Sequence, residues 1–398
     1  MRMRLTVPAN YDSSILPDLK RYGAFELYGK LPFDVTGGGR PSYMATALSK
    51  RGLAQYIGDV HRHGLEFNYL LNSACFGNSE WTRAFHRKLD SLLTWLTDLK
   101  VETLTIAAPY LVQVVKKRFP HFKVKVGIYA QVDTVKRAQY WEDLGCDTIN
   151  LESFSINRDF ETLAKIRQAV KADLVLIANH FCQPNCPYQI QHQNGHAHAS
   201  GLNPTFYIDY PIMQCQKNRL THKELFISAG WIRPEDTARY EAIGYSTFKL
   251  LERNIPSDIL VQRARAYFER RWEGNLADLL LSWGFKKRPP KWSPAHMLKA
   301  FRFWKMPLGL AGPALAFLKG NGMLLYTQEK NPITIDTAAI PADFLDRFAK
   351  GSCLNRECRQ CGYCAGIADK AVSIDPAFLA QMLPVYDKLE NTLVSGRF

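Results

Sequence analysis

Residues 103–151 read TLTIAAPYLVQVVKKRFPHFKVKVGIYAQVDTVKRAQYWEDLGCDTINL, and this stretch decides the fold. It contains three short runs rich in β-forming residues, which are separated by two amphipathic segments. The β-rich runs are residues 103–106, 123–129 and 148–151, and the amphipathic segments are residues 110–119 and 134–144. Strands that alternate with helices at this spacing are typical of a parallel sheet.

The same alternation extends in both directions through the first 250 residues. Further β-rich runs lie at residues 4–7, 25–28, 66–71, 174–178 and 247–251, and further amphipathic segments lie at residues 51–63, 80–99, 160–170 and 234–243. Eight strands with intervening helices predict an α/β fold of the (β/α)8 TIM-barrel type over residues 1–278. An open doubly wound sheet is the alternative, but Val7-Pro8-Ala9-Asn10 is not the glycine-rich phosphate loop that such a sheet needs after its first strand.

The residues that directly follow the strands are mostly polar. In a (β/α)8 barrel these positions meet at one face, where such enzymes hold their chemistry. We therefore take as candidate catalytic residues Asn72, Glu152, His180 and Arg253. The same rule also selects Asn10, Tyr28, Pro109, Gln131, Ser153, Asn179 and Glu252. Asn, Ser and Gly are also common turn formers, so a structural role is the alternative for each position.

The composition is that of a soluble globular protein. The 398 residues are 46% hydrophobic and 22% charged, which excludes disorder, collagen and coiled coil. No stretch approaches the roughly twenty uninterrupted apolar residues of a membrane-spanning helix, and the N-terminus has neither the apolar core nor the cleavage site of a signal peptide. We therefore expect a cytoplasmic protein whose nine cysteines do not form disulfides.

The formal charge of +14 favours an anionic partner, and much of it lies in one segment. From residue 279 to 328 there is no Asp or Glu, and the basic residues there are Lys286, Lys287, Arg288, Lys291, Lys299, Arg302, Lys305 and Lys319. Aromatic side chains interleave them at residues 299–305, and an apolar run follows at residues 306–318. This basic bridge, residues 279–330, suits contact with an anionic membrane surface, contact with RNA, or a linker packed on the barrel.

The alternation breaks after the seventh strand, where residues 179–221 form an insertion rich in cysteine and histidine. The insertion holds Cys182, Cys186, Cys215, His180, His192, His196 and His198. Thiolates at this spacing can bind one metal centre, and Pro184 and Pro187 would keep the backbone between them out of a helix. A mixed Cys/His zinc site and an iron–sulfur cluster both remain open, because a cluster needs a fourth thiolate that the insertion lacks.

Two further cysteines lie in the barrel. Cys75 follows the third strand, on the face expected to be catalytic, whereas Cys146 precedes the sixth strand at the opposite end. Position therefore favours Cys75 as the missing ligand, and Cys146 is expected to be a small buried residue without a metal. Among the histidines, His180 is the best candidate for a ligand, an acid or base, or a substrate contact, because it lies at a strand end beside the thiols.

A second cysteine cluster lies near the C-terminus. Four thiols fall within twelve residues, at Cys353, Cys358, Cys361 and Cys364. Packing alone does not explain such a cluster, so we expect a metal centre. Structural zinc and a second iron–sulfur cluster are the alternatives, and the ferredoxin-like Cys-x4-Cys-x2-Cys spacing slightly favours the cluster. Helical segments at residues 343–348 and 365–372 flank it and make residues 331–398 a small C-terminal unit.

Several pieces of the sequence resemble peptidase family U32, the collagenase-like proteins. They are Glu26-Leu27-Tyr28-Gly29, residues 72–78, the cysteine-bearing insertion, residues 231–236 and residues 248–253. The resemblance covers most of the barrel and the C-terminal extension that some branches of the family carry. The usual family signature, a Glu-x-Phe motif that runs into Cys and Gly residues, is replaced here by NHFCQPNCP at residues 179–187, which leaves substrate and reaction type open.

The resemblance implies an oxygen-independent hydroxylase more than a protease. The studied branches look like hydroxylases that modify RNA bases or the ring of a quinone precursor. These enzymes carry a [4Fe-4S] cluster on four cysteines and take the oxygen atom from prephenate. By similarity, the implied cluster ligands are Cys182, Cys186 and Cys215, with Cys75 as the fourth. Prephenate carries two carboxylates, which require cationic partners such as Arg253 and Arg40.

The sequence therefore predicts an iron–sulfur enzyme that hydroxylates or otherwise modifies a small or lipidic molecule, with a prephenate-like oxygen donor. Residues 286–319 would place it at the inner face of the membrane. The alternatives are an RNA-modifying enzyme, a peptidase as the family name suggests, and a non-catalytic iron–sulfur partner of a paired subunit. Neither a Ser/His/Asp order nor a zinc-protease helix motif is legible in the sequence.

Overall fold

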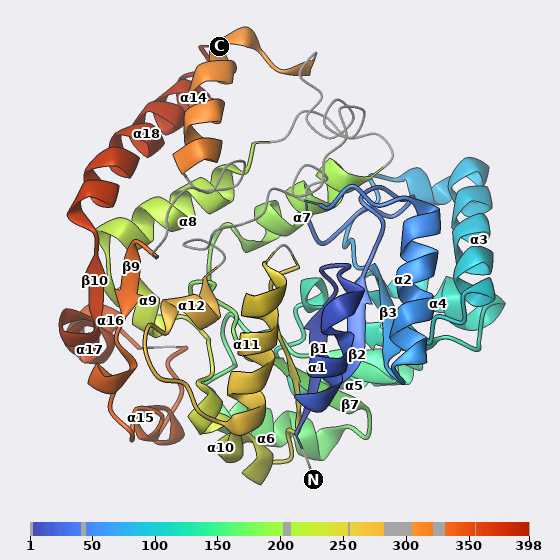
Figure 1. Cartoon of the computed structure of the whole chain (residues 1–398), viewed down its shortest axis with the longest axis horizontal. Coiled ribbons are helices and arrows are strands. Elements are labelled where there is room, and N and C mark those ends of the chain that lie inside the picture. The colour runs from blue at the N-terminus through green and yellow to red at the C-terminus, as the bar shows by residue number, and fades with distance from the viewer. Residues whose placement is uncertain are drawn as a thin grey trace.

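Eight parallel strands close into a barrel (Figure 1). The computed structural model describes residues 3–40, 45–201, 208–253, 255–281, 305–320, 331–354 and 356–397. The strands pair in chain order, and β8 closes the ring on β1. They are β1 (Arg4–Pro8), β2 (Ala24–Gly29), β3 (Glu66–Leu71), β4 (Thr103–Ile106), β5 (Lys123–Val126), β6 (Thr148–Asn150), β7 (Asp173–Ile177) and β8 (Thr247–Lys249). The predicted (β/α)8 barrel is therefore confirmed.

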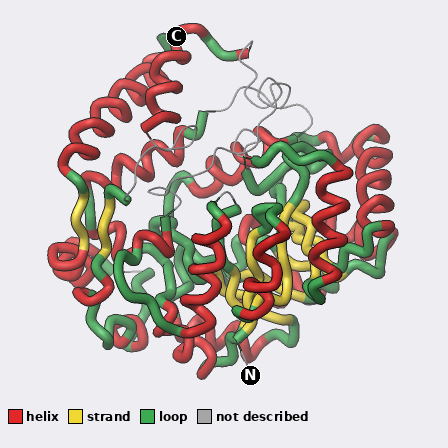
Figure 2. The backbone as a smooth tube through the Cα atoms, in the orientation of Figure 1, coloured by secondary structure: helices red, strands yellow, loops and turns green. Residues whose placement is uncertain are grey.

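Helices surround the strands (Figure 2). They are α1 (Leu16–Arg21), α2 (Lys50–Arg62), α3 (Arg83–Asp98), α4 (Pro109–Arg118), α5 (Val135–Asp143), α6 (Phe160–Ala169), α10 (Thr237–Ala242) and α11 (Ser257–Glu269). Helix α2 shows why such segments pack on the barrel: its buried residues recur every three or four positions and form one apolar face, at Leu53, Tyr56, Ile57 and Val60. The Ser49 side chain caps the start of this helix.

Two elements end at other positions than the pattern predicts. The predicted strand at residues 123–129 ends at Val126, and the chain continues into the 3-10 turn Ile128–Ala130. The β-forming side chains of this turn lie at the mouth of the barrel and do not extend the strand. The predicted helix at residues 80–99 is interrupted at Thr82, because this side chain caps the start of α3.

The barrel interior holds a buried ion pair. Lys125 Nζ lies 2.6 and 2.7 Å from the two carboxylate oxygens of Glu26. Thr6 and Asn68 donate to the same carboxylate at 2.6 and 3.2 Å. Burial alone would raise the pKa of Glu26, but Lys125 and the two hydrogen bonds outweigh it and lower the pKa. Glu26 and Lys125 are therefore charged but paired with each other in the barrel interior, beneath its mouth.

The insertion after β7 folds mainly as helices. It contains α7 (Gln189–Ser200) and α8 (Tyr210–Thr221), and α9 (Glu224–Ser228) follows it. As predicted, the chain around Pro184 and Pro187 is not helical, and α7 begins directly after it. Helices α7 and α8 have no counterpart among the predicted elements, because their Gln, His and Asn residues lack the apolar periodicity that marks a helix in a sequence.

The C-terminal unit packs beside the insertion. Its elements are β9 (Ile333–Ile335), α15 (Asp346–Ala349), α16 (Cys358–Cys361), α17 (Tyr363–Ala371), β10 (Val372–Ile374) and α18 (Pro376–Ser395), and β9 pairs with β10 in antiparallel orientation. Helix α18 lies along α8 and α14 (Leu308–Gly320) (Figure 1). The helices predicted at residues 343–348 and 365–372 correspond to α15 and α17 with shifted ends, whereas α18 lies beyond the predicted elements.

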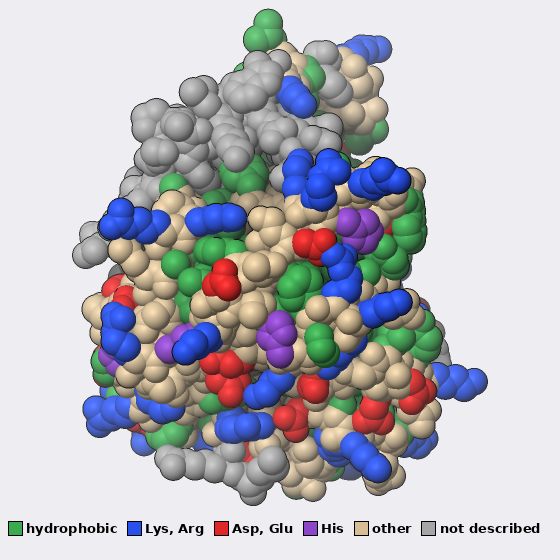
Figure 3. All heavy atoms as spheres, turned by 90° about the vertical axis from the view of Figure 1, so that its right-hand side faces the viewer, with side chains coloured by type: hydrophobic (Ala, Val, Ile, Leu, Met, Phe, Trp, Pro, Cys, Tyr) green, Lys and Arg blue, Asp and Glu red, His purple; other side chains and the backbone are tan. Residues whose placement is uncertain are grey.

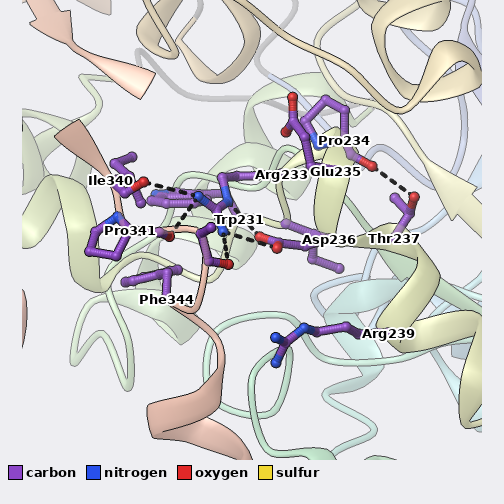
Figure 4. A network of polar contacts seen from close by, with 12 residues as sticks. Trp231, Arg233, Pro234, Glu235, Asp236, Thr237, Arg239, Ile340, Pro341 and Phe344 are labelled. Atoms are coloured by element: carbon purple, nitrogen blue, oxygen red, sulfur yellow. Dashed lines mark hydrogen bonds and ion pairs between the residues drawn. The ribbon is translucent and has the colours of Figure 1, made fainter. Parts of the chain in front are cut away.

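Aromatic and arginine side chains join the C-terminal unit to the barrel (Figure 4). Trp231 stacks on Phe344 with ring centroids 5.5 Å apart. Beside them, Arg233 bonds the Asp236 carboxylate at 2.7 and 3.0 Å and donates to the carbonyl of Pro341 at 3.1 Å. The Trp231, Arg233 and Phe344 side chains are buried. The C-terminal unit is therefore docked on the barrel through a specific contact.

Most of the basic bridge lies outside the described residues. Of the eight basic residues between positions 279 and 328, Lys305 is exposed, Lys319 lies in α14, and the other six fall outside the described ranges. Helix α14 packs on α18, yet its Leu308 is 92% exposed. On the side of the barrel that carries α3 and α4, Lys and Arg are spread among acidic and neutral side chains (Figure 3). Contact of residues 286–319 with a membrane or RNA stays a prediction.

In the described part of the chain, no helix has the length and apolar character needed to cross a membrane.

Candidate active site at the mouth of the barrel

A cavity of about 270 Å³ opens at the carboxyl ends of the strands. Its walls come from the strand ends, from the loop that follows β2 and from the helices of the insertion. Three of the four predicted catalytic residues line this barrel cavity, namely Asn72, His180 and Arg253. Their position agrees with the rule that the residues after each strand gather at one face.

Glu152, the fourth predicted catalytic residue, does not line the barrel cavity. Its carboxylate accepts the backbone N–H of Phe154 at 2.7 Å and both the N–H and the hydroxyl of Ser155, at 2.9 and 2.6 Å. Burial nevertheless raises the pKa of Glu152. The carboxylate folds back on its own loop and so fixes the turn that carries Ser153.

The three cysteines of the insertion line the barrel cavity together. Cys182 lies on the loop after β7, Cys186 lies just before α7, and Cys215 lies on α8. Burial raises the pKa of the Cys182 thiol, and the nearby Cys215 and Cys186 raise it further. A bound metal centre would deprotonate such thiols. Cys75 lies on the loop after β3, at the same end of the barrel, but is not among the lining residues.

His180 lies against these thiols. Its Nε2 is 3.1 Å from Sγ of Cys182, its Nδ1 contacts Oγ of Ser153, and its ring packs 4.7 Å from the Phe154 ring. Burial lowers the pKa of His180 to about 3, and nearby cations lower it as well. His180 is therefore a neutral imidazole at physiological pH.

Positive charge exceeds negative charge in the cavity wall. The lining cations are Arg40, Arg219, Lys249 and Arg253, and the lining carboxylates are Asp209 and Glu252. Arg40 forms an ion pair with Glu252. Burial lowers the pKa of Lys249 to about 7, and the cations of Lys125 and Arg253 act in the same direction. The remaining positive charge predisposes the cavity to bind an anion.

Several buried polar atoms of the cavity wall have no hydrogen-bond partner among the described residues. They are Asn72 Oδ1, Gln189 Nε2, Gln193 Nε2 and Arg219 Nε. Native proteins rarely leave such atoms unpaired, because each costs about 1–3 kcal/mol. The residues that line the cavity therefore carry hydrogen-bonding capacity that the described protein groups do not use.

Three consecutive glycines bring the barrel mouth and the insertion together. Gly37, Gly38 and Gly39 have φ angles of 66°, 106° and 78°, a region that favours glycine. A Cβ at Gly37 would lie 2.2 Å from the carbonyl oxygen of Ala197 on α7, and one at Gly38 would lie 2.7 Å from the nitrogen of Ser73. These approaches exclude a side chain and hold α7 over the end of β3.

The four C-terminal cysteines line a second pocket, of about 660 Å³, which we call the C-terminal pocket. Three of these thiols are exposed, and Cys364 is half-buried. The backbone N–H of Tyr363 and the Arg347 guanidinium, 3.4 Å from Sγ, lower the pKa of Cys361. The four predicted ligands are thus grouped at one surface pocket. Cys146 is buried apart from both sets, and burial raises its pKa to about 12.

Helix α8 forms part of the wall of both pockets. Cys215 and Arg219 line the barrel cavity, whereas Asn218 and His222, at its C-terminal end, line the C-terminal pocket. The sequence does not indicate this shared wall, because it depends on how α8 is oriented between the barrel and the C-terminal unit.

Comparison with known proteins bears on the family. The sequence profile of Peptidase family U32 matches residues 36–182. The chain is 31% identical over 257 residues to the uncharacterized protease MJ1657 of Methanocaldococcus jannaschii, a match that covers 65% of this chain and 75% of the relative. The solved U32 peptidase Mk0906 is 20% identical with a TM-score of 0.49, over 64% of this chain and 95% of that one. Phosphoribosyl anthranilate isomerase from Thermus thermophilus is 11% identical with a TM-score of 0.37, over 68% and 98%. By the extent of its match to the archaeal relative, the chain belongs to peptidase family U32.

Proposed function

We propose that this U32 protein is an iron–sulfur enzyme that modifies an anionic small or lipidic molecule by oxygen-independent hydroxylation, with a prephenate-like dicarboxylate as oxygen donor. The observation that supports it is the meeting of three cysteine thiols and four cationic side chains in one cavity of about 270 Å³. Thiolates are the usual ligands of iron–sulfur clusters, and Arg and Lys are the usual partners of carboxylates.

The donor set of the barrel cavity fits a cluster better than a single zinc ion. Tetrahedral zinc with Zn–S bonds of about 2.3 Å brings its ligand sulfurs within about 4 Å of one another. Among the described residues, Cys182, Cys186 and Cys215 do not form a group whose ligand atoms all lie within 4.8 Å. A cubane cluster separates its thiolates more widely, because iron and sulfide ions lie between them. Cys75 stays the proposed fourth ligand, and its loop would have to move for the thiol to reach the cavity.

The chain's own side chains would bind and orient the anion. When bound, a cluster would supply the electron-handling centre that hydroxylation without dioxygen needs. Arg253 and Lys249 would hold carboxylates of the donor, and Asn72, which also lines the cavity, would help to orient it. His180, a neutral imidazole whose Nε2 lies 3.1 Å from Sγ of Cys182, would be a hydrogen-bonding partner of this ligand.

Metal analysis of anaerobically purified protein tests this proposal. We expect brown protein with iron and acid-labile sulfide, and Cys182→Ser, Cys186→Ser and Cys215→Ser should each lose the barrel share of both. Cys146→Ser is the matched control and should retain them, because Cys146 is buried outside both pockets. A second cluster at the C-terminal cysteines is separated by measuring the same variants in a Cys358→Ser/Cys361→Ser background. Zinc without labile sulfide in the barrel would overturn the proposal.

A thiol peptidase is the second candidate, and one contact favours it. Cys182 Sγ lies 3.1 Å from His180 Nε2, and Ser153 contacts the other ring nitrogen, which is the order of a nucleophile, a base and an orienting group. The relatives also carry the names protease and peptidase. Burial, however, raises the pKa of Cys182 and lowers that of His180, so the resting pair is neutral and poorly activated.

Metal-free protein distinguishes the two candidates. A thiol peptidase would hydrolyse a fluorescent casein substrate without metal, and Cys182→Ser would abolish the activity whereas Cys215→Ser would not. The iron–sulfur proposal predicts no hydrolysis by the metal-free chain and equal effects of the two variants on iron content.

A further inference from the structure

Two histidines and one aspartate converge in the barrel cavity. His192 and His196 lie four residues apart on α7, so their side chains lie on one face of the helix. Asp209, directly before α8, meets both: its Oδ2 lies 3.0 Å from Nε2 of His192 and 2.9 Å from Nε2 of His196. The Asp209 side chain is only 2% exposed. The three ligand atoms all lie within 4.8 Å of one another.

We propose that His192, His196 and Asp209 bind one divalent first-row transition-metal ion, of the Zn²⁺ or Fe²⁺ class, as a site separate from the cysteine thiols. Two imidazoles and a carboxylate form the donor set of zinc sites with an open position and of non-haem iron sites. The three residues line the barrel cavity, so open coordination positions would face a bound anion. Elsewhere in the described chain, His, Cys, Asp and Glu side chains do not converge as closely.

The Asp209 carboxylate is held in place by the helix that follows it. Its Oδ1 accepts the backbone N–H of Ile212 at 3.1 Å and so caps α8. Its other oxygen, Oδ2, is the one that faces both histidines. The cap therefore orients the second oxygen toward the proposed metal, as hydrogen bonds to metal-binding carboxylates commonly do.

His196 also has a partner for its second ring nitrogen. The hydroxyl of Tyr129 lies 3.4 Å from Nδ1 of His196. A neutral imidazole that binds a metal through Nε2 carries its proton on Nδ1, and an oxygen acceptor there fixes the tautomer and the ring. Tyr129 is therefore a positioning residue for the proposed site, supplied by the turn after β5.

The helix that carries both histidines is fixed to the barrel. The backbone N–H of Gly38 donates to Oγ of Ser200, the last residue of α7, at 2.9 Å. Together with the close approach of Gly37 to Ala197, this contact sets the height of α7 above the strands. The two imidazoles are thus placed by a rigid element, which a metal site requires for defined geometry.

The proposed metal site does not depend on the iron–sulfur proposal. Thiolates select iron–sulfur clusters and other soft centres, whereas imidazole and carboxylate select ions such as Zn²⁺ and Fe²⁺. Replacing the histidines or the aspartate leaves every cysteine in place. Metal loss at one site with retention at the other is therefore measurable, and either proposal can fail alone.

Titration of the metal-free full chain with Co²⁺ alone, under reducing conditions without oxygen, tests the site. Equilibrium dialysis with elemental analysis gives the number of ions bound, and thiolate-to-cobalt charge-transfer absorption reports the cysteine sites separately. We expect His192→Ala, His196→Ala and Asp209→Asn each to bind about one Co²⁺ fewer than the parent, with unchanged charge-transfer intensity. His198→Ala is the matched control, because His198 is exposed on the same helix.

A loss of Co²⁺ binding in these variants can be distinguished from misfolding of the variants. Asn at position 209 keeps an oxygen that can cap α8, and circular dichroism of each variant should match the parent. Unchanged Co²⁺ binding in all three variants would overturn the site. A loss matched by an equal loss of charge-transfer intensity, or an equal loss in His198→Ala, would also overturn it. Iron and labile sulfide in anaerobic protein should be the same in these variants as in the parent.

Discussion

The two cysteine sets of this chain lie in opposite environments. The thiols of the barrel cavity lie among cations and unpaired amides, and burial raises the pKa of Cys182. Most thiols of the C-terminal pocket are exposed, and a backbone N–H together with Arg347 lowers the pKa of Cys361. The first set therefore shares its space with groups that can bind a ligand, whereas the second set lies at the surface of a docked unit. The two sets therefore differ in burial and in charged surroundings, although both are short-range clusters of cysteines in the sequence.

The largest expected effect concerns the contact that ties the two regions together. Phe344 is buried between Trp231 and Tyr363, with ring centroids 5.5 and 5.9 Å away. Phe344→Ala should lower the free energy of unfolding by about 3–5 kcal/mol, because a large buried ring is lost. Urea denaturation measures this, with Tyr140→Ala, at a half-exposed ring, expected to cost under about 0.5 kcal/mol. Equal effects of the two substitutions would show that the docking contact contributes little.

Two glycines with positive φ, one in each region, give the next contrast. Gly38 has φ 106°, and an added Cβ would lie 2.7 Å from the Ser73 nitrogen, whereas Gly362 has φ 64° and nothing within 4 Å. Gly38→Ala should cost about 2–3 kcal/mol from strain plus collision, and Gly362→Ala about 1 kcal/mol from strain alone. Thermal unfolding of the two variants provides the measurement. The reverse order would contradict the close packing of the barrel mouth on the insertion.

Arginines of the two pockets should differ in ligand binding. Arg253→Leu should weaken the binding of prephenate by about 10- to 100-fold, because a charge-assisted hydrogen bond is lost from the barrel cavity. Arg347→Leu removes a guanidinium from the C-terminal pocket and should leave this affinity unchanged. Isothermal titration calorimetry of both variants makes the comparison. Equal weakening would mean that the anion does not bind in the barrel cavity specifically.

The smallest expected effect is a pH dependence confined to the barrel. The pKa of Lys249 is lowered by burial to about 7, so its ammonium is charged below that pH and neutral above it. Affinity for prephenate should therefore fall by up to about tenfold between pH 6 and pH 8. Lys249→Met should bind more weakly at pH 6 and lose this dependence. A parent protein whose affinity is flat over this range would exclude Lys249 from anion binding.

The sequence predicts the scaffold well because the scaffold rests on local patterns. Short β-rich runs and amphipathic helices are legible one element at a time, and their count predicts the closed barrel that forms. The clustering of Cys182 and Cys186 is local too, and both line the cavity. Cys215 shares that cavity because α8 packs across the mouth, and the sequence places it only within the insertion.

Side-chain direction accounts for what the sequence does not predict. Glu152 follows a strand as an active-site residue would, but its carboxylate bonds the backbone two and three residues on. Lys249 lies within a β-rich run, and only the register of β8 turns it toward the cavity. Asp209 meets His192 and His196 from 17 and 13 positions further along the chain, and no pattern in the sequence indicates that contact.

Because α8 forms part of the wall of both pockets, a charge in one pocket lies close enough to influence the electrostatic potential in the other. Cys215 and His222, one on each wall, are seven residues apart, which at about 1.5 Å per residue is on the order of 10 Å. This distance is about one Debye length at 0.1 M ionic strength, the distance over which salt screens exposed charges. Because protein and not salt water lies between the two positions, the screening is weaker. A unit of charge gained or lost in the C-terminal pocket is thus only partly screened from the barrel cavity. A change of charge at the C-terminal thiols would therefore alter the electrostatic potential in the barrel cavity.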